Sequence, residues 1–234
     1  MVKLALLGKN ISHSKSKFVY ESILGKKIDF SLIESSEEEI SSNISIFLDL
    51  YDGINVTAPF KKFCFELFNS LQIVNKNFKK VGSINCVSRK NGITEAHNTD
   101  FISNLILFNA IFSLKKFNQI IILGDGATSN MVSNILEMLN HKFTIFSRRQ
   151  NSSIELSTLD LTKYEEGLLV VNCCSREFLF KGKLPKQSVF LDQNYQHLNN
   201  QKNISNLENV FYIDGGALLC MQAFYSLIMF KLIK

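Results

Sequence analysis

The chain has 234 residues, of which 46% are hydrophobic and 20% charged, as in globular proteins that bury a core in one large or two small domains. Its formal net charge is only +5, and no basic stripe interleaved with aromatic residues is present, which argues against nucleic acid as a partner. The five cysteines are odd in number and lack the spacing of metal ligands, so we expect reduced thiols in a cytoplasmic protein without a bound metal.

The N-terminal part of the chain alternates between strand and helix patterns. Apolar runs predict strands at 2–7, 28–33 and 53–56. Helical periodicity predicts helices at about 16–24, 36–47 and 60–71. Ser16 is a candidate N-cap of the first helix, and Gly25 is a candidate for its C-terminal turn. Strand patterns at 83–89 and 93–96 flank the pair Asn91-Gly92 and predict a β-hairpin.

A long apolar helix is predicted to begin at Asn98-Thr99-Asp100, and beyond it the alternation resumes. Strands are predicted at 119–123, 142–146, 168–172, 188–192 and 210–213, with a helix at about 128–140 between the first two. The last apolar run, 217–230, is shorter than the ~20 residues that span a bilayer, and Gln222 and Ser226 interrupt it. We therefore expect a buried terminal helix and no membrane association.

The strand at 119–123 leads into Gly124-Asp125-Gly126 and then into a helix. Dinucleotide-binding domains have this order, because the glycines permit a tight turn and the helix N-terminus faces a pyrophosphate; an ordinary strand–helix turn is the alternative. The next strand ends in Ser147-Arg148-Arg149, where an acid would bind the ribose of NAD and an arginine accommodates the 2′-phosphate of NADP. No acid follows until Glu155, so this position favours NADP over NAD, with a solvated arginine pair as the alternative.

Two short polar segments lie where a predicted strand stops and a helix begins, Asn55-Val56-Thr57-Ala58-Pro59-Phe60-Lys61 and Asn98-Thr99-Asp100. Open α/β sheets bind small ligands at such places. Lys61 and Asp100 follow different strands of one predicted sheet, so we expect them to converge. A lysine beside a carboxylate can move a proton to or from a hydroxyl or carbonyl oxygen. Two capped helix starts would explain the same residues without a function.

These segments belong to a series of motifs that resembles the shikimate dehydrogenase family over nearly the whole chain. In chain order the motifs are Ser12-His13-Ser14-Lys15-Ser16, Asn55 to Lys61, Gly82-Ser83-Ile84-Asn85, Asn98-Thr99-Asp100, Leu123 to Ala127, Ser147-Arg148-Arg149, Asp192-Gln193-Asn194-Tyr195, and Asp214-Gly215 followed by Gln222. The chain departs from the family pattern in the glycine loop, where Asp125 adds a negative charge and Ala127 replaces a glycine.

The resemblance implies a two-lobed α/β fold. Residues 1–101 and 215–234 would form an N-terminal α/β substrate-binding domain, and residues 102–214 a Rossmann-type, doubly wound nucleotide-binding domain. The implied activity is the NADPH-dependent, reversible reduction of 3-dehydroshikimate to shikimate in chorismate and aromatic amino-acid biosynthesis. Lys61 and Asp100 would be the catalytic residues, with Lys61 as acid or base and Asp100 bonded to it and to the substrate hydroxyls.

The resemblance also implies the remaining site residues. The expected substrate ligands are Ser14, Ser16, Thr57, Asn85, Thr99, Tyr195 and Gln222. The expected cofactor ligands are Gly124, Gly126, Ala127, Ser147, Arg148, Arg149, Asn172 and Gly215. A buried unpaired amide on the apolar helix would cost ~1–3 kcal/mol, so Gln222 has either a protein partner or the substrate.

The interpretation therefore includes a small-molecule substrate, NADP as cofactor, and a monomer or homodimer. A NAD-preferring quinate/shikimate dehydrogenase is one alternative, against which Arg148 and Arg149 argue. A non-catalytic sugar-acid or nucleotide-binding relative is another; the altered glycine loop favours it, and Lys61 with Asp100 argues against it. An enzyme similar to methylenetetrahydrofolate dehydrogenase would share the lysine but not the two-serine motif.

Overall fold

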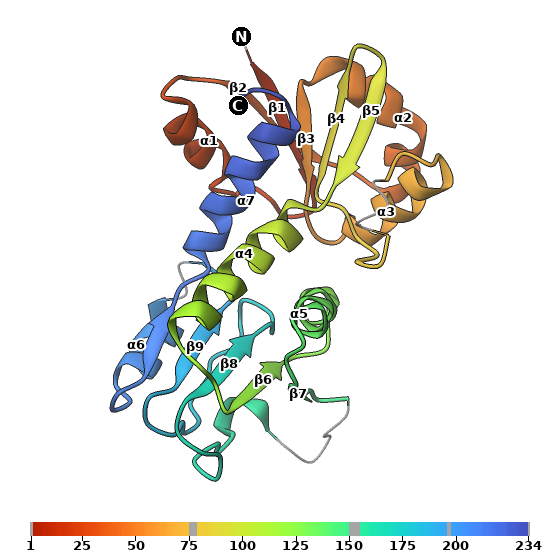
Figure 1. Cartoon of the computed structure of the whole chain (residues 1–234). Coiled ribbons are helices and arrows are strands. Elements are labelled where there is room, and N and C mark those ends of the chain that lie inside the picture. Colours follow the sequence, from red (N-terminus) through yellow and green to blue (C-terminus); the bar gives the residue numbers. More distant parts are fainter. Residues whose placement is uncertain (1, 75–78, 150–154, 196–197, 234) are drawn as a thin grey trace. The chain divides into compact units, whose positions relative to one another are not determined.

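The structure, a computed structural model, describes residues 2–74, 79–149, 155–195 and 198–233. The chain divides into two compact units, which we call unit 1 (Met1–Ser103 with Cys220–Lys234) and unit 2 (Asn104–Leu219) (Figure 1). Both boundaries lie inside helices, in α4 (Thr99–Leu114) and α7 (Gly216–Met229). The boundaries expected from the sequence, 102 and 215, lie near the starts of these helices, because sequence patterns mark where a helix begins and not which contacts it makes along its length.

Unit 1 contains a five-stranded mixed sheet in the order β2-β1-β3-β4-β5. The strands are β1 (Lys3–Gly8), β2 (Asp29–Glu34), β3 (Gly53–Val56), β4 (Cys86–Lys90) and β5 (Ile93–His97). β1 pairs in parallel with β2 and β3, whereas β4 is antiparallel to both β3 and β5. β3 and β5 therefore run in the same direction, and their carboxyl ends lie at the same edge of the sheet.

Three helices of unit 1 connect the strands: α1 (Ser16–Leu24), α2 (Glu37–Leu50) and α3 (Lys61–Ser70). α2 begins with a capping box in which Ser36 and Glu39 each bond the other's backbone N–H. Ser16 is the first residue of α1 and not its N-cap as expected, because its own N–H is already bonded to the Ser14 hydroxyl at 3.2 Å. Gly25 ends α1 with a φ of 63°, in the left-handed region that glycine adopts without strain.

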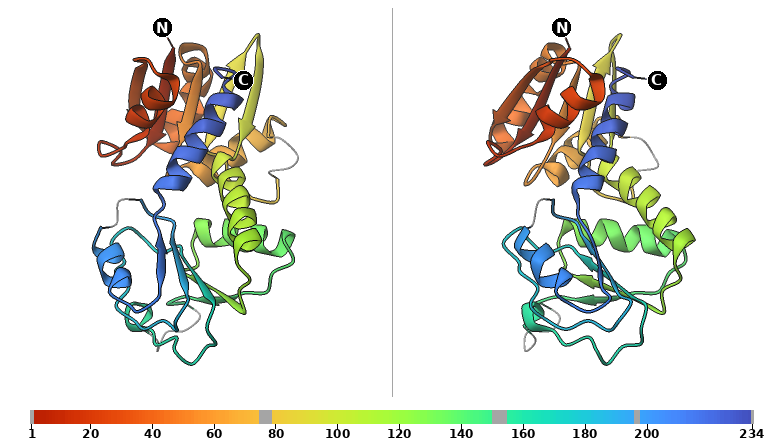
Figure 2. Two further views of the ribbon diagram at one scale, coloured as in Figure 1. Left: turned by 60° about the vertical axis from the view of Figure 1, so that its left-hand side comes forward. Right: turned by 90° about the vertical axis from the view of Figure 1, so that its left-hand side faces the viewer.

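The two faces of the unit 1 sheet are covered by different helices. α2 and α3 lie on one face, and α1 and the C-terminal part of α7 lie on the other (Figures 1 and 2). The second face is closed by Phe230, whose ring packs on Gly53 so closely that a Cβ atom at position 53 would overlap it. Residues 220–234 thus complete the domain that residues 1–103 form.

Unit 2 contains a five-stranded, fully parallel sheet in the order β10-β9-β8-β6-β7. The strands are β6 (Gln119–Leu123), β7 (Thr144–Phe146), β8 (Leu168–Asn172), β9 (Val189–Asp192) and β10 (Phe211–Ile213). The chain steps from β6 outward to β7 and then back across β6 to β8, which is the switch of direction of a doubly wound fold. Ligands of such folds bind beyond the carboxyl ends of the strands at that switch.

One hydrophobic cluster of unit 2 lies on one face of this sheet, where Ile121, Val170 and Phe190 pack against residues of connecting segments such as Leu156, Phe180 and Ile204. Ile122 of β6 is fully buried as well, but it is not part of this cluster. Leu156 belongs to the short 3₁₀ helix η2 (Leu156–Thr158), and Ile204 to α6 (Leu198–Ser205). α5 (Ala127–Met138) follows β6. Within the described ranges no helix is long and apolar enough to cross a membrane.

The sequence did not predict α6, because six of its eight residues are polar. The structure shows what holds it. The buried side chain of Asn200 donates from Nδ2 to Asp192 Oδ2 at 2.9 Å and accepts at Oδ1 from the N–H of Phe180 at 2.8 Å. Tertiary contacts of this kind stabilise short helices whose own propensity is weak.

Candidate active site

Lys61 and Asp100 form an ion pair in unit 1, with 2.7 Å between Nζ and Oδ2. Lys61 is the first residue of α3, after β3, and Asp100 is the second residue of α4, after β5. Because β3 and β5 are parallel, the two helix starts meet at one edge of the sheet, and the expected convergence is observed. The side chains are 33% and 25% exposed, so both can still be reached by a ligand.

Asn98 fixes the start of α4. Its Oδ1 accepts a hydrogen bond from the N–H of Phe101 at 2.8 Å, which caps the helix, while Nδ2 donates to the backbone oxygen of Ser83 at 2.9 Å. The capped helix start that the sequence offered as an alternative is therefore present. It coexists with the ion pair, since the cap is made by Asn98 and the ion pair by Asp100 in the first turn, where the helix dipole favours a carboxylate.

A buried polar network lies beside the ion pair. Its members, each from a different segment, are Tyr20, Asn55, Asn85, Thr99 and Ser226. Asn85 Oδ1 accepts from the N–H of Thr99 at 2.7 Å and from its hydroxyl at 3.1 Å. Ser226 Oγ lies 3.0 Å from Thr99 Oγ1 and accepts from Asn55 Nδ2 at 3.1 Å. The Tyr20 hydroxyl donates to Asn55 Oδ1.

The network is a rigid support for Thr99 and Asn85. Burial raises the pKa of the Tyr20 hydroxyl, and nearby Cys86 and Asp100 raise it further, so Tyr20 stays protonated and keeps donating to Asn55. Burial also raises the pKa of the Cys86 thiol. All five cysteines of the chain are free, and this thiol cannot supply a thiolate nucleophile at neutral pH.

Ser14 and Ser16 lie together at the start of α1. The Ser14 hydroxyl donates to Ser16 Oγ at 3.1 Å and accepts from the N–H of Ser16 at 3.2 Å. Ser16 is buried and Ser14 half-buried. Two hydroxyls at a helix N-terminus make a site that suits a carboxylate. Tyr20 lies one turn further along the same helix, so α1 joins this site to the polar network.

Thr57 and Gln222 are the other expected substrate ligands of unit 1. Thr57 follows β3 and packs on Gly8, where an added Cβ would lie 2.5 Å from Thr57 Cγ2. Gln222 is half-buried on α7, and its backbone oxygen accepts from the Ser226 hydroxyl at 2.8 Å, so it lies one turn from the polar network. Tyr195 belongs to unit 2, where the guanidinium of Arg176 lies 5.1 Å from the centre of its ring.

A pocket of about 770 Å³ lies in unit 2 at the carboxyl ends of β6 and β8. Its lining includes residues 124–126, 155–157 and 173–175 with Arg148, Glu177 and Phe178. The volume is in the range of small-molecule sites, and its place is the direction switch of the sheet. Gly124 has a φ of 101° and an added Cβ would lie 3.1 Å from the backbone oxygen of Cys173, so glycine is required there.

Three of the predicted cofactor residues line the pocket, and the others do not. The pocket brings together Gly124, Gly126 and Arg148. The side chain of Arg149 is 86% exposed, and its Nε lies 3.8 Å from Asp125 Oδ2. Ala127 is the first residue of α5, and Ser147 is fully buried at the end of β7.

Two predicted cofactor residues have structural contacts. Asn172 is fully buried; it donates from Nδ2 to Asp192 Oδ1 at 3.1 Å and accepts at Oδ1 from the N–H of Cys174 at 3.1 Å. Gly215 donates its N–H to the Asn194 oxygen at 3.1 Å, and an added Cβ would lie 2.7 Å from that oxygen. Both hold the turns after β8 and β10.

Sequence reasoning missed Tyr20 and Ser226 in unit 1, and Glu155 and Glu177 in the pocket. Ser226 had a signal, because it lies four residues after Gln222 on an apolar helix and so shares its side. Glu155 had a signal as well, because it is the first acid after Arg149. Tyr20 and Glu177 had none. Within the described part of the chain, no group of three or more His, Cys, Asp or Glu side chains could hold a metal ion.

Comparison with known proteins assigns the family. The family model described as the shikimate dehydrogenase substrate binding domain matches residues 6–87. The shikimate dehydrogenase (NADP(+)) of Prochlorococcus marinus subsp. pastoris is 30% identical over 179 residues, covering 72% of this chain and 60% of that protein. The chain belongs to the shikimate dehydrogenase family. It spans about 60% of the length of the curated relatives it matches.

Solved structures of shikimate dehydrogenases share the fold. That of the Aquifex aeolicus protein has a TM-score of 0.74 at 22% identity, covering 99% of this chain and 93% of that one. The shikimate 5-dehydrogenase of Thermus thermophilus, solved in complex with NADP(H) and shikimate, has a TM-score of 0.73 at 18% identity, covering 100% and 94%. The α/β architecture, with an N-terminal substrate-binding domain and a doubly wound second domain, agrees with the expectation from the sequence.

Proposed function

We propose that this chain is an NADP-dependent shikimate dehydrogenase, which interconverts 3-dehydroshikimate and shikimate in chorismate biosynthesis. The observation that carries the proposal is the 2.7 Å pair of Lys61 Nζ and Asp100 Oδ2, beside the polar network, in a member of this family. Two ionisable groups of opposite charge at a reachable sheet edge suit proton transfer at an oxygen atom.

Reduction of a ketone places a hydride on carbon and a proton on oxygen. A bound NADPH supplies the hydride. Lys61 donates the proton to the carbonyl oxygen as its C=O bond becomes C–OH, and the neutral amine then takes a proton from water. In the reverse direction Lys61 accepts the hydroxyl proton. Asp100 orients the Lys61 ammonium through the 2.7 Å contact and accepts hydrogen bonds from substrate hydroxyls.

The substrate is held by groups with defined donor and acceptor roles. Ser14 and Ser16 bind its carboxylate at the N-terminus of α1. Asn85, Thr57, Thr99 and Gln222 bind ring hydroxyls, since hydroxyl and amide side chains both donate and accept. The Thr99 hydroxyl donates to Asn85 Oδ1 and lies 3.0 Å from Ser226 Oγ, which leaves at least one of its lone pairs to accept from the substrate. Tyr195 stays a proposed substrate ligand.

The pocket of unit 2 suits a dinucleotide by its position and its volume. Gly124 makes the tight turn, Gly126 precedes the N-terminus of α5, and Arg148 lines the same space. We propose that these residues bind the cofactor, with Arg148 at the 2′-phosphate and the more exposed Arg149 as a weaker ligand, and that Ala127, Ser147, Asn172 and Gly215 shape the surrounding backbone.

A NAD-preferring quinate/shikimate dehydrogenase is the second candidate, because Asp125, Glu155 and Glu177 also line the pocket. Both candidates are tested by following the absorbance of reduced nicotinamide with shikimate and with quinate, each with NADP and with NAD. Fastest reduction of NADP with shikimate supports the first candidate. Fastest reduction of NAD with quinate supports the second. Shikimate binding in calorimetry without any reduction would indicate a non-catalytic relative.

We also propose that the protein acts in the cytoplasm on its small-molecule substrate, as a monomer or a homodimer. Five free cysteines support a reducing compartment. Light scattering coupled to gel filtration would give the mass in solution, and a mass above that of two chains would contradict the proposed state.

A further inference from the structure

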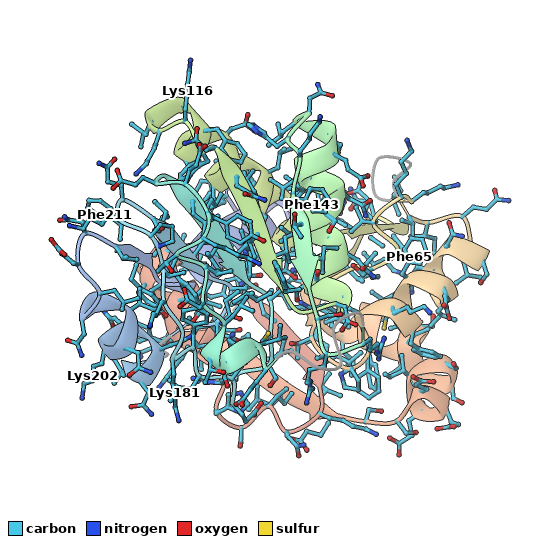
Figure 3. All side chains as sticks on the ribbon, turned by 90° about the horizontal axis from the view of Figure 1, so that it is seen from below. Phe65, Lys116, Phe143, Lys181, Lys202 and Phe211 are labelled. Atoms are coloured by element: carbon cyan, nitrogen blue, oxygen red, sulfur yellow. The ribbon has the colours of Figure 1, made fainter. Side chains whose placement is uncertain are left out.

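The unit 2 pocket has an unusual charge balance for a site that binds a phosphorylated ligand. Among the described residues that line it, Arg148 carries a positive charge, whereas Asp125, Glu155 and Glu177 carry negative charges. Arg149 lies outside the lining, 3.8 Å from Asp125. Lys116, Lys181 and Lys202 of the same unit point outward (Figure 3), and none of them is among the lining residues. The described lining thus has one cation against three carboxylates.

Glu155 is held in the pocket by the fold. It precedes η2, and its Oε1 accepts a hydrogen bond from the Ser157 hydroxyl at 2.5 Å. The backbone oxygen of Ser157 accepts a hydrogen bond from the backbone N–H of Lys181 at 2.6 Å, and Leu156 is buried in the core of the unit. Glu155 is exposed, and the Ser157 hydroxyl holds one of its carboxylate oxygens at the pocket.

Arg148 and Glu155 occupy the two ends of one connection. Arg148 follows β7, which ends at Phe146, and Glu155 precedes η2, which begins at Leu156. Both side chains line the same pocket. An arginine and a carboxylate at this end of a nucleotide-binding sheet select opposite cofactors, because the arginine binds a 2′-phosphate and the carboxylate accepts from a free 2′-hydroxyl.

Resting on the proposed function, we propose that Glu155 is a specificity-determining residue that opposes Arg148 and lowers the preference of this site for a 2′-phosphate. Its negative charge repels the phosphate group of NADP, and its second oxygen accepts from the ribose hydroxyl of NAD. Asp125 lies in the glycine turn, where it faces phosphates common to both cofactors, so its effect is the same for the two.

The test compares two ligands that differ by the 2′-phosphate alone, adenosine 2′,5′-bisphosphate and adenosine 5′-monophosphate, whose dissociation constants are measured by calorimetry. Glu155→Gln keeps an acceptor for the Ser157 hydroxyl and removes the charge. We expect this variant to bind the bisphosphate roughly 3- to 10-fold more tightly. Its affinity for the monophosphate should stay the same or fall by up to about 3-fold. Glu155→Lys should tighten the bisphosphate further, and high salt should reduce both effects.

Two control variants separate this role from a general charge effect. Glu165→Gln removes an exposed carboxylate that does not line the pocket, so the affinity for both ligands should stay the same. Asp125→Asn should tighten both ligands by the same factor. The inference is overturned if Glu155→Gln changes the affinities for both ligands equally. It is also overturned if Glu165→Gln changes the affinities in the same way as Glu155→Gln. Failure of the wild-type protein to bind either ligand or NADP would instead remove the proposed cofactor site itself, and the inference with it.

Discussion

Asn85 Oδ1 accepts two hydrogen bonds from Thr99, from the backbone N–H at 2.7 Å and from the hydroxyl at 3.1 Å. This double contact joins the segment before β4 to the first turn of α4, next to Asp100. Because Ser226 also lies 3.0 Å from the Thr99 hydroxyl, that hydroxyl is held in one orientation before any ligand binds. A site that is fixed in this way does not have to be ordered when the substrate arrives.

Thr99→Val should therefore impair both the fold and the substrate site. The substitution keeps the shape of the side chain but removes a buried hydroxyl from two partners, so we expect a loss of about 1–3 kcal/mol in the free energy of unfolding. The KM for shikimate should rise while the Kd for NADP stays the same. Thr99→Ser, which keeps the hydroxyl, is the matched control. Urea unfolding and steady-state kinetics measure the two effects, and an unchanged KM would exclude Thr99 as a substrate ligand.

Lys61→Ala should lower turnover by about 10²- to 10⁴-fold, the usual contribution of a general acid or base. The affinity for shikimate, measured by calorimetry, should change much less. Lys62→Ala is the control, because Lys62 is the next residue of α3, is largely exposed and forms a 3.7 Å ion pair with Glu66 instead. Near-normal turnover of the Lys61 variant would remove this lysine from the mechanism.

Replacing Ser14 and Ser16 together by alanine should raise the KM for shikimate by about tenfold, since two hydrogen bonds to a charged group are lost. The KM for NADP should be unaffected. An analogue without the carboxylate should bind the variant and the parent alike, and Ser42→Ala on the exposed surface of α2 serves as a control. Equal weakening of shikimate and of the analogue would show that the serines support the fold.

Arg148→Ala should weaken NADP binding by at least about tenfold and leave NAD binding nearly unchanged, since a charge-assisted hydrogen bond to the 2′-phosphate contributes ~1.5–3 kcal/mol. Arg149→Ala should have a smaller effect, because its side chain is 86% exposed and lies near Asp125. Fluorescence titration with each cofactor measures both. If the double variant loses NAD and NADP equally, the arginines bind the pyrophosphate or support the fold, and the NAD-preferring alternative becomes the better interpretation.

Stability should depend on pH through His97. Burial lowers its pKa below the ordinary value of 6.5, although Glu95 raises it in part. In the window between the lowered pKa and about 6.5 the unfolded chain binds more protons than the folded one, so the free energy of unfolding decreases as the pH falls through this window. His97→Gln should show a smaller decrease between about pH 7.5 and 5.5 in urea unfolding. His13→Gln, at an exposed position, should behave like the parent.

The sequence was sufficient for the features that depend on neighbouring residues. Strand ends followed by polar residues located Lys61 and Asp100, and the parallel order of β3 and β5 explains why they meet. The capping pattern placed α1 within one residue, but the Ser14 contact that moves the cap from Ser16 to Lys15 depends on the folded loop.

The sequence was insufficient where distant segments decide the contacts. Tyr20 and Ser226 are 206 positions apart and meet through Asn55, so no local pattern identifies them together. Glu155 lies seven residues after Arg148, and it returns to the pocket because the core holds Leu156. The α6 helix is polar in sequence and depends on Asn200 and Asp192.

The packing of Phe230 on Gly53 affects the order in which the two units can fold during synthesis of the chain. Unit 2 is one continuous stretch, Asn104–Leu219, whereas unit 1 needs Cys220–Lys234 to cover its sheet and to bring Ser226 to Asn55 and Thr99. A ribosome makes residues 220–234 after residues 104–219. Unit 2 can therefore fold before unit 1 is complete, although residues 1–103 of unit 1 are made before unit 2.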